Sequence, residues 1–150
     1  APKSNKMTLK LFRAAWFLSA LVVLANLLYV YASLPELVTV QDGETVSISR
    51  EWLFYLSLIS IVLINALVYL FKMMFPEGED VRTWFHGLII TINIFFILAL
   101  HALNVYNSNE IFNHQLVGFY LTGSLGLILF WAAVWPVYLV FQKIFLKQVV

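Results

Sequence analysis

The sequence predicts an all-α integral membrane protein, with four transmembrane helices in an antiparallel up-down-up-down bundle and a short, outer β-hairpin-like loop. Three observations predict this fold class. Charged residues make up 11% of the chain, whereas soluble domains carry about 25%. Four apolar segments are each long enough to cross a bilayer, which takes about 20 residues. The three connections between them are short, so that neighbouring helices must run antiparallel.

The four spans are expected to form a single membrane domain over residues 1–150. We place them at about residues 11–33, 52–74, 83–104 and 116–145. The last span contains Pro136, which can kink a helix. A cleaved signal peptide is the alternative interpretation of the first span, because basic residues lie near its start and Val30-Tyr31-Ala32 resembles a cleavage site. We count this segment as a retained helix because the chain still includes it.

The distribution of lysine and arginine predicts the direction of the spans. These residues lie in the N-terminal tail, around the 73–82 connection and near the C-terminus. The first connection has Arg50 among four acidic residues, and the third has no lysine or arginine. Because basic residues favour the cytoplasmic side, we expect both termini and the 73–82 connection in the cytoplasm, and residues 34–51 and 105–115 outside.

The outer loop, residues 34–51, has the pattern of a β-hairpin. Valine and isoleucine alternate with polar residues on both sides of Asp42-Gly43. A two-residue turn pairs Val40 with Thr45, whereas a three-residue loop pairs Val40 with Val46 and Val38 with Ile48. Turn chemistry favours the first register, and the burial of apolar residues on one face favours the second.

An isolated hairpin is marginally stable in water, so we expect this one to lean on the bundle, on lipid headgroups or on a partner. The residues that would dock a partner are Leu34, Pro35, Val38, Val40, Val46 and Ile48.

The segment Y31-A-S-L-P-E-L-V-T-V40, between a first helix and a second helix that opens with aromatic residues, carries a family resemblance. Residues 14–72 resemble the small bacterial membrane domain of SdpI-related immunity and signalling proteins. Members of that family usually continue with a proline and a histidine, where this chain has Val40-Gln41. The resemblance implies a multi-pass protein of the bacterial inner (plasma) membrane, and it implies no specific activity.

Three of the predicted spans carry one asparagine each at middle depths of the membrane: Asn26, Asn65 and Asn93. An amide in hydrocarbon needs hydrogen-bond partners, and interhelical hydrogen bonds supply them. We expect these side chains to join helices. A polar cavity for a small ligand and contact with another subunit are the alternatives.

The fourth span contains three glycines, Gly118, Gly123 and Gly126. Small residues let helices approach closely, so we expect them to pack inside the bundle, with a dimer interface as the alternative. The run Trp131-Ala-Ala-Val-Trp-Pro136 is bulky and is expected to face lipid or a neighbouring protein.

The chain has three histidines, His86, His101 and His114. His86 and His101 lie about 22 Å apart along one helix, too far to share a haem. His101 and His114 are close enough in depth to meet near the outer surface, and with Glu110 two imidazoles and a carboxylate would make a conceivable metal set. The spacing fits no ligand motif, so no cofactor or metal is predicted; we expect hydrogen-bonded interfacial histidines.

No acidic or basic residue lies deep in a predicted span, which argues against an autonomous ion transporter. We expect no enzyme, because the sequence has no catalytic triad, phosphate-binding loop or paired intramembrane carboxylates. The absence of cysteine excludes disulfides and iron–sulfur clusters. The net charge of +1 predicts no nucleic-acid partner.

The expected function is a non-catalytic accessory or scaffold subunit of a larger bacterial inner-membrane complex, acting by helix packing and outer-loop docking. Its partners would be membrane lipids, including bound lipid, and other integral membrane subunits, with no soluble small-molecule substrate. Two alternatives stay open. One is a redox-complex subunit that contributes to a quinone or haem site, and the other is an SdpI-like immunity or signalling protein that senses a ligand with residues 34–51.

Overall fold

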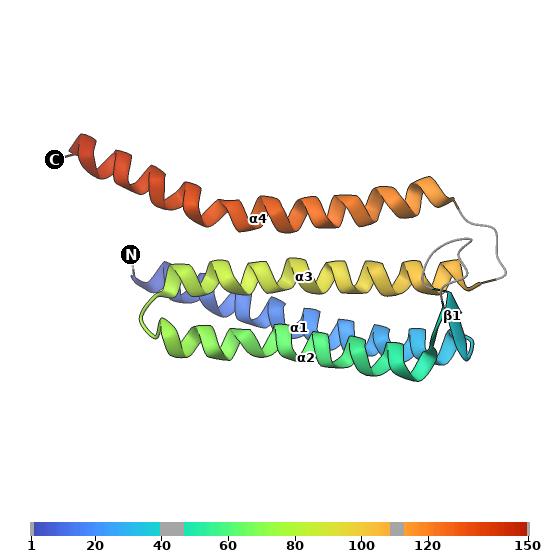
Figure 1. The fold of residues 1–150 in the computed structure, drawn as a ribbon. Helices are drawn as coiled ribbons and strands as arrows, with labels where there is room; N and C mark the ends of the chain where they lie inside the picture. The colour runs from blue at the N-terminus through green and yellow to red at the C-terminus, as the bar shows by residue number, and fades with distance from the viewer. Residues whose placement is uncertain (1, 40–46, 109–112, 150) are drawn as a thin grey trace.

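The computed structural model describes residues 2–39, 47–108 and 113–149, and it shows four long apolar helices packed as a bundle (Figure 1). The elements are α1 (Pro2–Ser33), β1 (Leu37–Thr39), β2 (Ser47–Ser49), α2 (Arg50–Met74), α3 (Glu79–Tyr106) and α4 (His114–Val149). Each helix contains a segment long and apolar enough to cross a membrane. The predicted fold class is therefore confirmed, and the four candidate spans are those of a multi-pass membrane protein.

Helices α1, α2 and α3 lie side by side, and α4 runs along α3 (Figure 1). The short hairpin of β1 and β2 lies at one end of the bundle, which we call the hairpin end. Both chain termini lie at the opposite end, the terminal end. The second half of α4, which contains Pro136 within the helix, bends away from α3 toward the terminal end. A proline lacks the N–H of a helical hydrogen bond and crowds the preceding turn, which explains the bend.

The helices extend beyond the predicted spans because their polar ends also adopt helical structure. Helix α1 already includes Lys6 and Lys10, which precede the apolar run, and lysine is a good helix former. Helix α3 begins after Gly78, whose position has no side-chain cap. The hydroxyl of Thr83 donates to the carbonyl of Glu79 inside the helix and does not cap its start.

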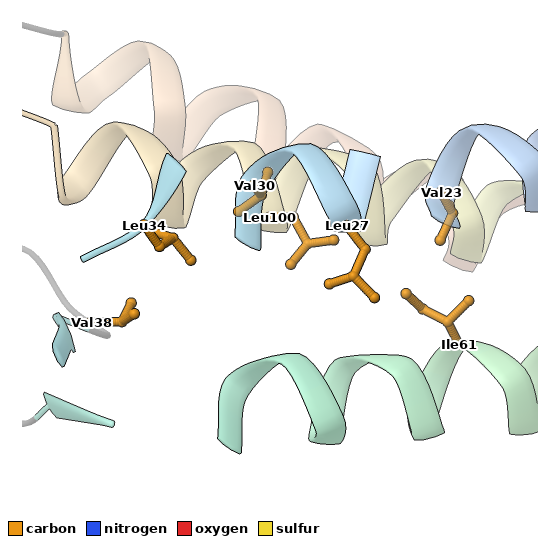
Figure 2. Close-up of a cluster of buried hydrophobic side chains, with 7 residues drawn as sticks. All are labelled: Val23, Leu27, Val30, Leu34, Val38, Ile61 and Leu100. Carbon is orange, nitrogen blue, oxygen red and sulfur yellow. The ribbon is translucent and has the colours of Figure 1, made fainter. Parts of the chain in front are cut away.

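A cluster of buried apolar side chains joins three helices and the hairpin near the hairpin end (Figure 2). Its members are Val23, Leu27, Val30, Leu34, Val38, Ile61 and Leu100. Val38 of β1 is fully buried in this cluster. The hairpin therefore leans on the bundle of its own chain, one of the three supports that we expected from the sequence.

The strands pair in the register that the burial pattern favours. Val38 is opposite Ile48, and Thr39 is opposite Ser47. This is the register of the three-residue loop, and it directs Val38 into the core. The Asp42-Gly43 turn and the expected pair of Val40 with Val46 lie outside the described residues.

Asn107, at the end of α3, binds the free edge of β1. Its side-chain oxygen accepts from the Thr39 backbone N–H at 2.7 Å, and its amide nitrogen donates to the Thr39 carbonyl at 3.0 Å. The amide group thus makes the two hydrogen bonds that a neighbouring strand would make. A two-stranded hairpin, which is marginal alone, gains a third row of hydrogen bonds.

Arg50 closes the base of the hairpin. Its backbone N–H donates to Glu36, and its guanidinium donates to the carbonyl of Leu34 at the end of α1. The guanidinium also lies 4.9 Å from the centre of the Tyr31 ring, in a cation–π contact. One side chain therefore ties the end of α1 to the start of α2.

We predict that Asn107→Ala loosens the hairpin without unfolding the helices. The substitution removes both hydrogen bonds to Thr39, and each buried backbone group left unpaired costs about 1–3 kcal/mol. Hydrogen–deuterium exchange of a peptide that includes Thr39 should accelerate by at least about tenfold. Ser108→Ala is the control, because Ser108 is exposed and bonds only to the Val105 carbonyl of its own turn. Equal exchange in the two variants would contradict the role of Asn107.

Candidate functional site

Two asparagines from neighbouring helices form a closed pair in the middle of the bundle. Asn65 of α2 donates to Asn93 of α3 at 2.9 Å, and Asn93 donates back to Asn65 at 2.9 Å. Asn93 has no exposed surface at all. Because the two amides use both a donor and an acceptor each, the pair fixes both the position and the orientation of the two side chains.

The asparagine pair extends to α1 through two further side chains. The indole N–H of Trp16 donates to the Asn65 oxygen at 2.9 Å. The second N–H of Asn93 donates to the Ser19 hydroxyl at 2.9 Å, and that hydroxyl donates to the carbonyl of Trp16. We call Trp16, Ser19, Asn65 and Asn93 the amide network; it joins α1, α2 and α3.

Every N–H group of the two asparagines has an acceptor, since the remaining one of Asn65 donates to the carbonyl of Ile61. A network with all donors used is stabilising in a low-dielectric interior. It has no spare donor for a substrate. The geometry is that of the helix-joining role expected for Asn65 and Asn93.

Asn26, the third intramembrane asparagine, lies apart from the amide network. Its amide donates to the backbone carbonyl of Ile97 in α3 at 3.4 Å. This contact also joins two helices, but it is long for a hydrogen bond and therefore weak.

Helix α4 is attached to α3 by two tryptophans. The indole of Trp84 donates to the backbone carbonyl of Trp131 at 2.9 Å, and the indole of Trp131 donates to the carbonyl of Trp84 at 2.9 Å. The Trp131 ring also stacks on Phe12 of α1 at 6.0 Å between centres. We call this reciprocal pair the tryptophan clamp; it corrects the expectation that Trp131 faces lipid or another protein.

Gly87 makes the tryptophan clamp possible. A Cβ atom at this position would lie 2.6 Å from two carbons of the Trp131 ring, closer than real atoms approach. The ring therefore rests on the bare backbone of α3. Sequence reasoning missed Gly87, although a glycine inside a long helix often marks a close approach.

The three glycines of α4 do not pack inside the bundle, and that expectation was wrong. No atom would lie within 4 Å of a Cβ added at Gly118, Gly123 or Gly126. The reason is that α4 turns a different side toward α3, which contains the buried Val117 and Ser124. The glycines face away from the bundle.

Two of the expected partner-docking residues are also in the wrong place for that role. Leu34 and Val38 are 4% and 0% exposed, inside the core of their own chain. Pro35 is exposed and Ile48 is half-buried, whereas Val40 and Val46 lie outside the described residues. Leu34 and Val38 hold the hairpin to the bundle, so they cannot contact a partner.

The histidines differ in environment. His86 is buried beside Trp16, with ring centres 5.7 Å apart, and its Nδ1 lies 2.7 Å from the carbonyl of Arg82. Because a carbonyl only accepts, this nitrogen carries the proton. Arg82 is also buried and donates to the carbonyl of Pro76. His86 and Arg82 thus tie the first turns of α3 to their surroundings.

His101 is exposed on α3, and its ring lies 6.1 Å from that of Tyr120 in α4. Within the described residues it has no hydrogen bond, in contrast to our expectation. The Tyr120 hydroxyl is buried and has no hydrogen-bond partner there either. The side chain of His114 and all of Glu110 lie outside the described residues.

We predict that the two central asparagines are energetically coupled. Asn65→Ala and Asn93→Ala each remove the reciprocal pair, so the double variant should lose less stability than the sum of the single losses. We expect a coupling energy of about 0.5–2 kcal/mol, measured by reversible unfolding in mixed detergent micelles. Asn65→Ala combined with Thr91→Val is the control, since the Thr91 hydroxyl donates only within α3. Additive losses in the asparagine cycle would show that the pair contributes nothing.

We predict that Gly87→Ala detaches α4 from α3. The new methyl group overlaps the Trp131 ring, and such overpacking costs about 1–3 kcal/mol. Thermal unfolding should show the loss, and fluorescence should report a more exposed Trp131. Gly123→Ala is the matched control, because the methyl group meets open space, and a helix gains about 0.5–1 kcal/mol from this exchange. The same response from both variants would contradict the clamp.

A scan against models of protein families, a search of curated proteins and a search of solved structures found no match to this chain.

Proposed function

We propose that this protein is a non-catalytic accessory or scaffold subunit of a larger complex in the bacterial inner membrane, with both termini in the cytoplasm. In this proposal the helix of another subunit packs on the outer face of α4, which we define as Gly118, Phe119, Thr122, Gly126 and Leu129. The closed amide network supports a structural role for the interior. The outer face of α4 supports docking to another membrane protein.

The single observation that carries the proposal is the spacing of small residues on this face. Gly118, Thr122 and Gly126 recur every four residues, so they lie along one side of the helix. All three are exposed, and open space surrounds both glycines. Our sequence reasoning considered the glycines alone and missed the row that Thr122 completes.

A helix that only contacts lipid has no need of this row. Each glycine costs about 1 kcal/mol of helix stability relative to alanine, and lipid chains adapt to larger side chains equally well. Small residues every four positions let a second helix approach the backbone closely. Large side chains border the row, since Phe119 and Leu129 are 76% and 72% exposed. A groove between large residues fits the ridge of a partner helix.

The pair of His101 and Tyr120 supports a second candidate, a redox-complex subunit that contributes to a quinone site. Tyr120 has a hydroxyl without a hydrogen-bond partner among the described residues, and His101 is exposed beside it. A quinone carbonyl is an acceptor that the hydroxyl can serve. An SdpI-like sensing role would instead use the exposed part of residues 34–51, where Pro35 is accessible.

We predict that Gly126→Leu removes co-purifying membrane subunits without harming the fold of the chain itself. The leucine meets open space within this protein, but it blocks the approach of a second helix. The tagged protein is purified in mild detergent, and bound proteins are quantified by mass spectrometry; we expect at least about a tenfold loss. Ala25→Leu is the control, because Ala25 is exposed on α1, away from the outer face of α4.

A visible spectrum and a quinone extraction on the same sample separate the candidates. Stoichiometric membrane subunits that disappear with Gly126→Leu, but not with Ala25→Leu, support the accessory role. A haem band or a bound quinone lost on His101→Ala or Tyr120→Phe supports the redox role. A protein that purifies alone and colourless contradicts both and favours the sensing role.

A further inference from the structure

A partly open pocket lies at the terminal end of the bundle, between α1, α3 and α4. It has a volume of about 270 Å³ and lies beside the tryptophan clamp. Five aromatic side chains line it together with one carboxylate: Phe12, Trp84, Trp131, Trp135, Tyr138 and Asp80. Thr8, Thr83 and Val134 complete the lining. We call it the aromatic pocket.

The aromatic rings come from α1, α3 and α4, and the tryptophan clamp holds the last two helices together. Trp84 and Trp135 lie 6.0 Å apart between ring centres, and Trp135 stacks on Tyr138 at 5.4 Å. These rings present electron-rich faces, which attract ammonium groups and recognise quaternary ammonium ligands in aromatic cages. The ring set therefore favours a cationic ligand.

Asp80 supplies the charge that such a ligand would pair with. Its carboxylate accepts one long hydrogen bond, from the Tyr138 hydroxyl at 3.4 Å. Within the part of the chain that the structure describes, no lysine or arginine pairs with it, and the one ion pair found there joins Arg50 and Glu51. Asp80 lies in the first turn of α3.

The surroundings add negative charge on the same side. Glu77, Glu79 and Asp80 line an adjoining hollow of about 320 Å³, and Trp135 stands between this hollow and the aromatic pocket. The positively charged groups of a ligand are thus attracted from outside as well as from within the pocket.

An apolar groove on α4 continues from the aromatic pocket. It has a volume of about 570 Å³, and it shares Val134 and Tyr138 with the pocket. The other residues along it are Phe130, Ala133, Val137 and Phe141. A ligand with an ammonium group and a hydrocarbon chain would place the first in the aromatic pocket and the second in the groove.

We propose that the aromatic pocket and the adjoining α4 groove bind a membrane lipid whose headgroup carries an amine, with the ammonium group between Asp80 and the aromatic rings. The pocket lies toward the terminal end of the four candidate spans, where this proposal places the lipid headgroups. The second half of α4, which contains Pro136, bends away from α3 (Figure 1), and the pocket beside it is partly open. The site is independent of the proposed docking face, which lies nearer the start of α4.

The test compares two lipids with the same acyl chains, of which only one has an ammonium group in its headgroup. Dihexanoyl-phosphatidylethanolamine and dihexanoyl-phosphatidylglycerol are titrated separately into the full-length protein in maltoside micelles, and tryptophan fluorescence reports binding near Trp84 and Trp135. We expect the ethanolamine lipid to bind at least about tenfold more tightly. Equal binding of the two lipids would overturn the proposal.

Variants identify the site. Asp80→Asn should lower the affinity for the ethanolamine lipid by about tenfold, and Trp135→Leu should weaken it through loss of the ring. Glu77→Gln is the matched control, because it removes one nearby carboxylate that does not line the aromatic pocket; its affinity should stay within about twofold. Unchanged binding in both Asp80→Asn and Trp135→Leu, with circular dichroism confirming the fold, would exclude this site.

Free ethanolamine distinguishes a lipid from a soluble amine. The lipid assignment predicts that ethanolamine alone binds at least about a hundredfold more weakly, because it cannot fill the apolar groove. If ethanolamine and the lipid saturate the fluorescence change at similar concentrations, the ligand is a soluble amine and the lipid assignment is wrong.

Discussion

The reciprocal hydrogen bonds between Asn65 and Asn93 are the constraint around which the three central helices are arranged. A polar side chain in hydrocarbon must find its partners within the protein, and these two amides find them in each other. The pair fixes the relative depth of α2 and α3, because a slide of one helical turn, about 5.4 Å, would break both bonds. Trp16 and Ser19 extend the constraint to α1. An apolar cluster that includes Ile61 and another that includes Ile89 surround the pair. Within each cluster, side chains from different helices are in contact because the asparagine pair fixes the relative depth of the helices.

Helix α4 is attached to the bundle by the tryptophan clamp and not by the amide network. This difference leaves one side of α4 exposed. It contributes no residue to the amide network; two indoles bind backbone carbonyls across the α3–α4 contact instead. The tryptophan clamp requires a residue without a side chain at position 87 of α3, where Gly87 lies. The clamp uses only one side of α4. The opposite side is left with Gly118 and Gly126 in open space. The attachment of α4 along a single stripe therefore leaves this side open for the second helix that we propose.

Composition and periodicity predicted the four spans and the existence of the hairpin, because these depend on local sequence. The register of the hairpin followed from a tertiary fact, the burial of Val38, and turn chemistry alone favoured the other one. The role of Asn107 depends on β1 lying beside the end of α3, which no local pattern encodes. The direction of the α4 glycines was predicted wrongly for the same reason. A small residue permits close approach, but it does not say which neighbour approaches.

The two ends of the bundle differ in how far their polar groups are paired. At the hairpin end, Arg50 and Asn107 satisfy backbone groups, and Val38 closes the core. At the terminal end, the bend at Pro136 separates α4 from α3, and aromatic rings surround Asp80 without a cationic partner among the described residues. Satisfied groups give rigidity, whereas an unpaired carboxylate beside electron-rich rings gives affinity for a cation. The hydrogen bonds at the hairpin end stabilise the bundle, so the carboxylate and the rings at the terminal end are left to bind the amine-bearing lipid that we propose.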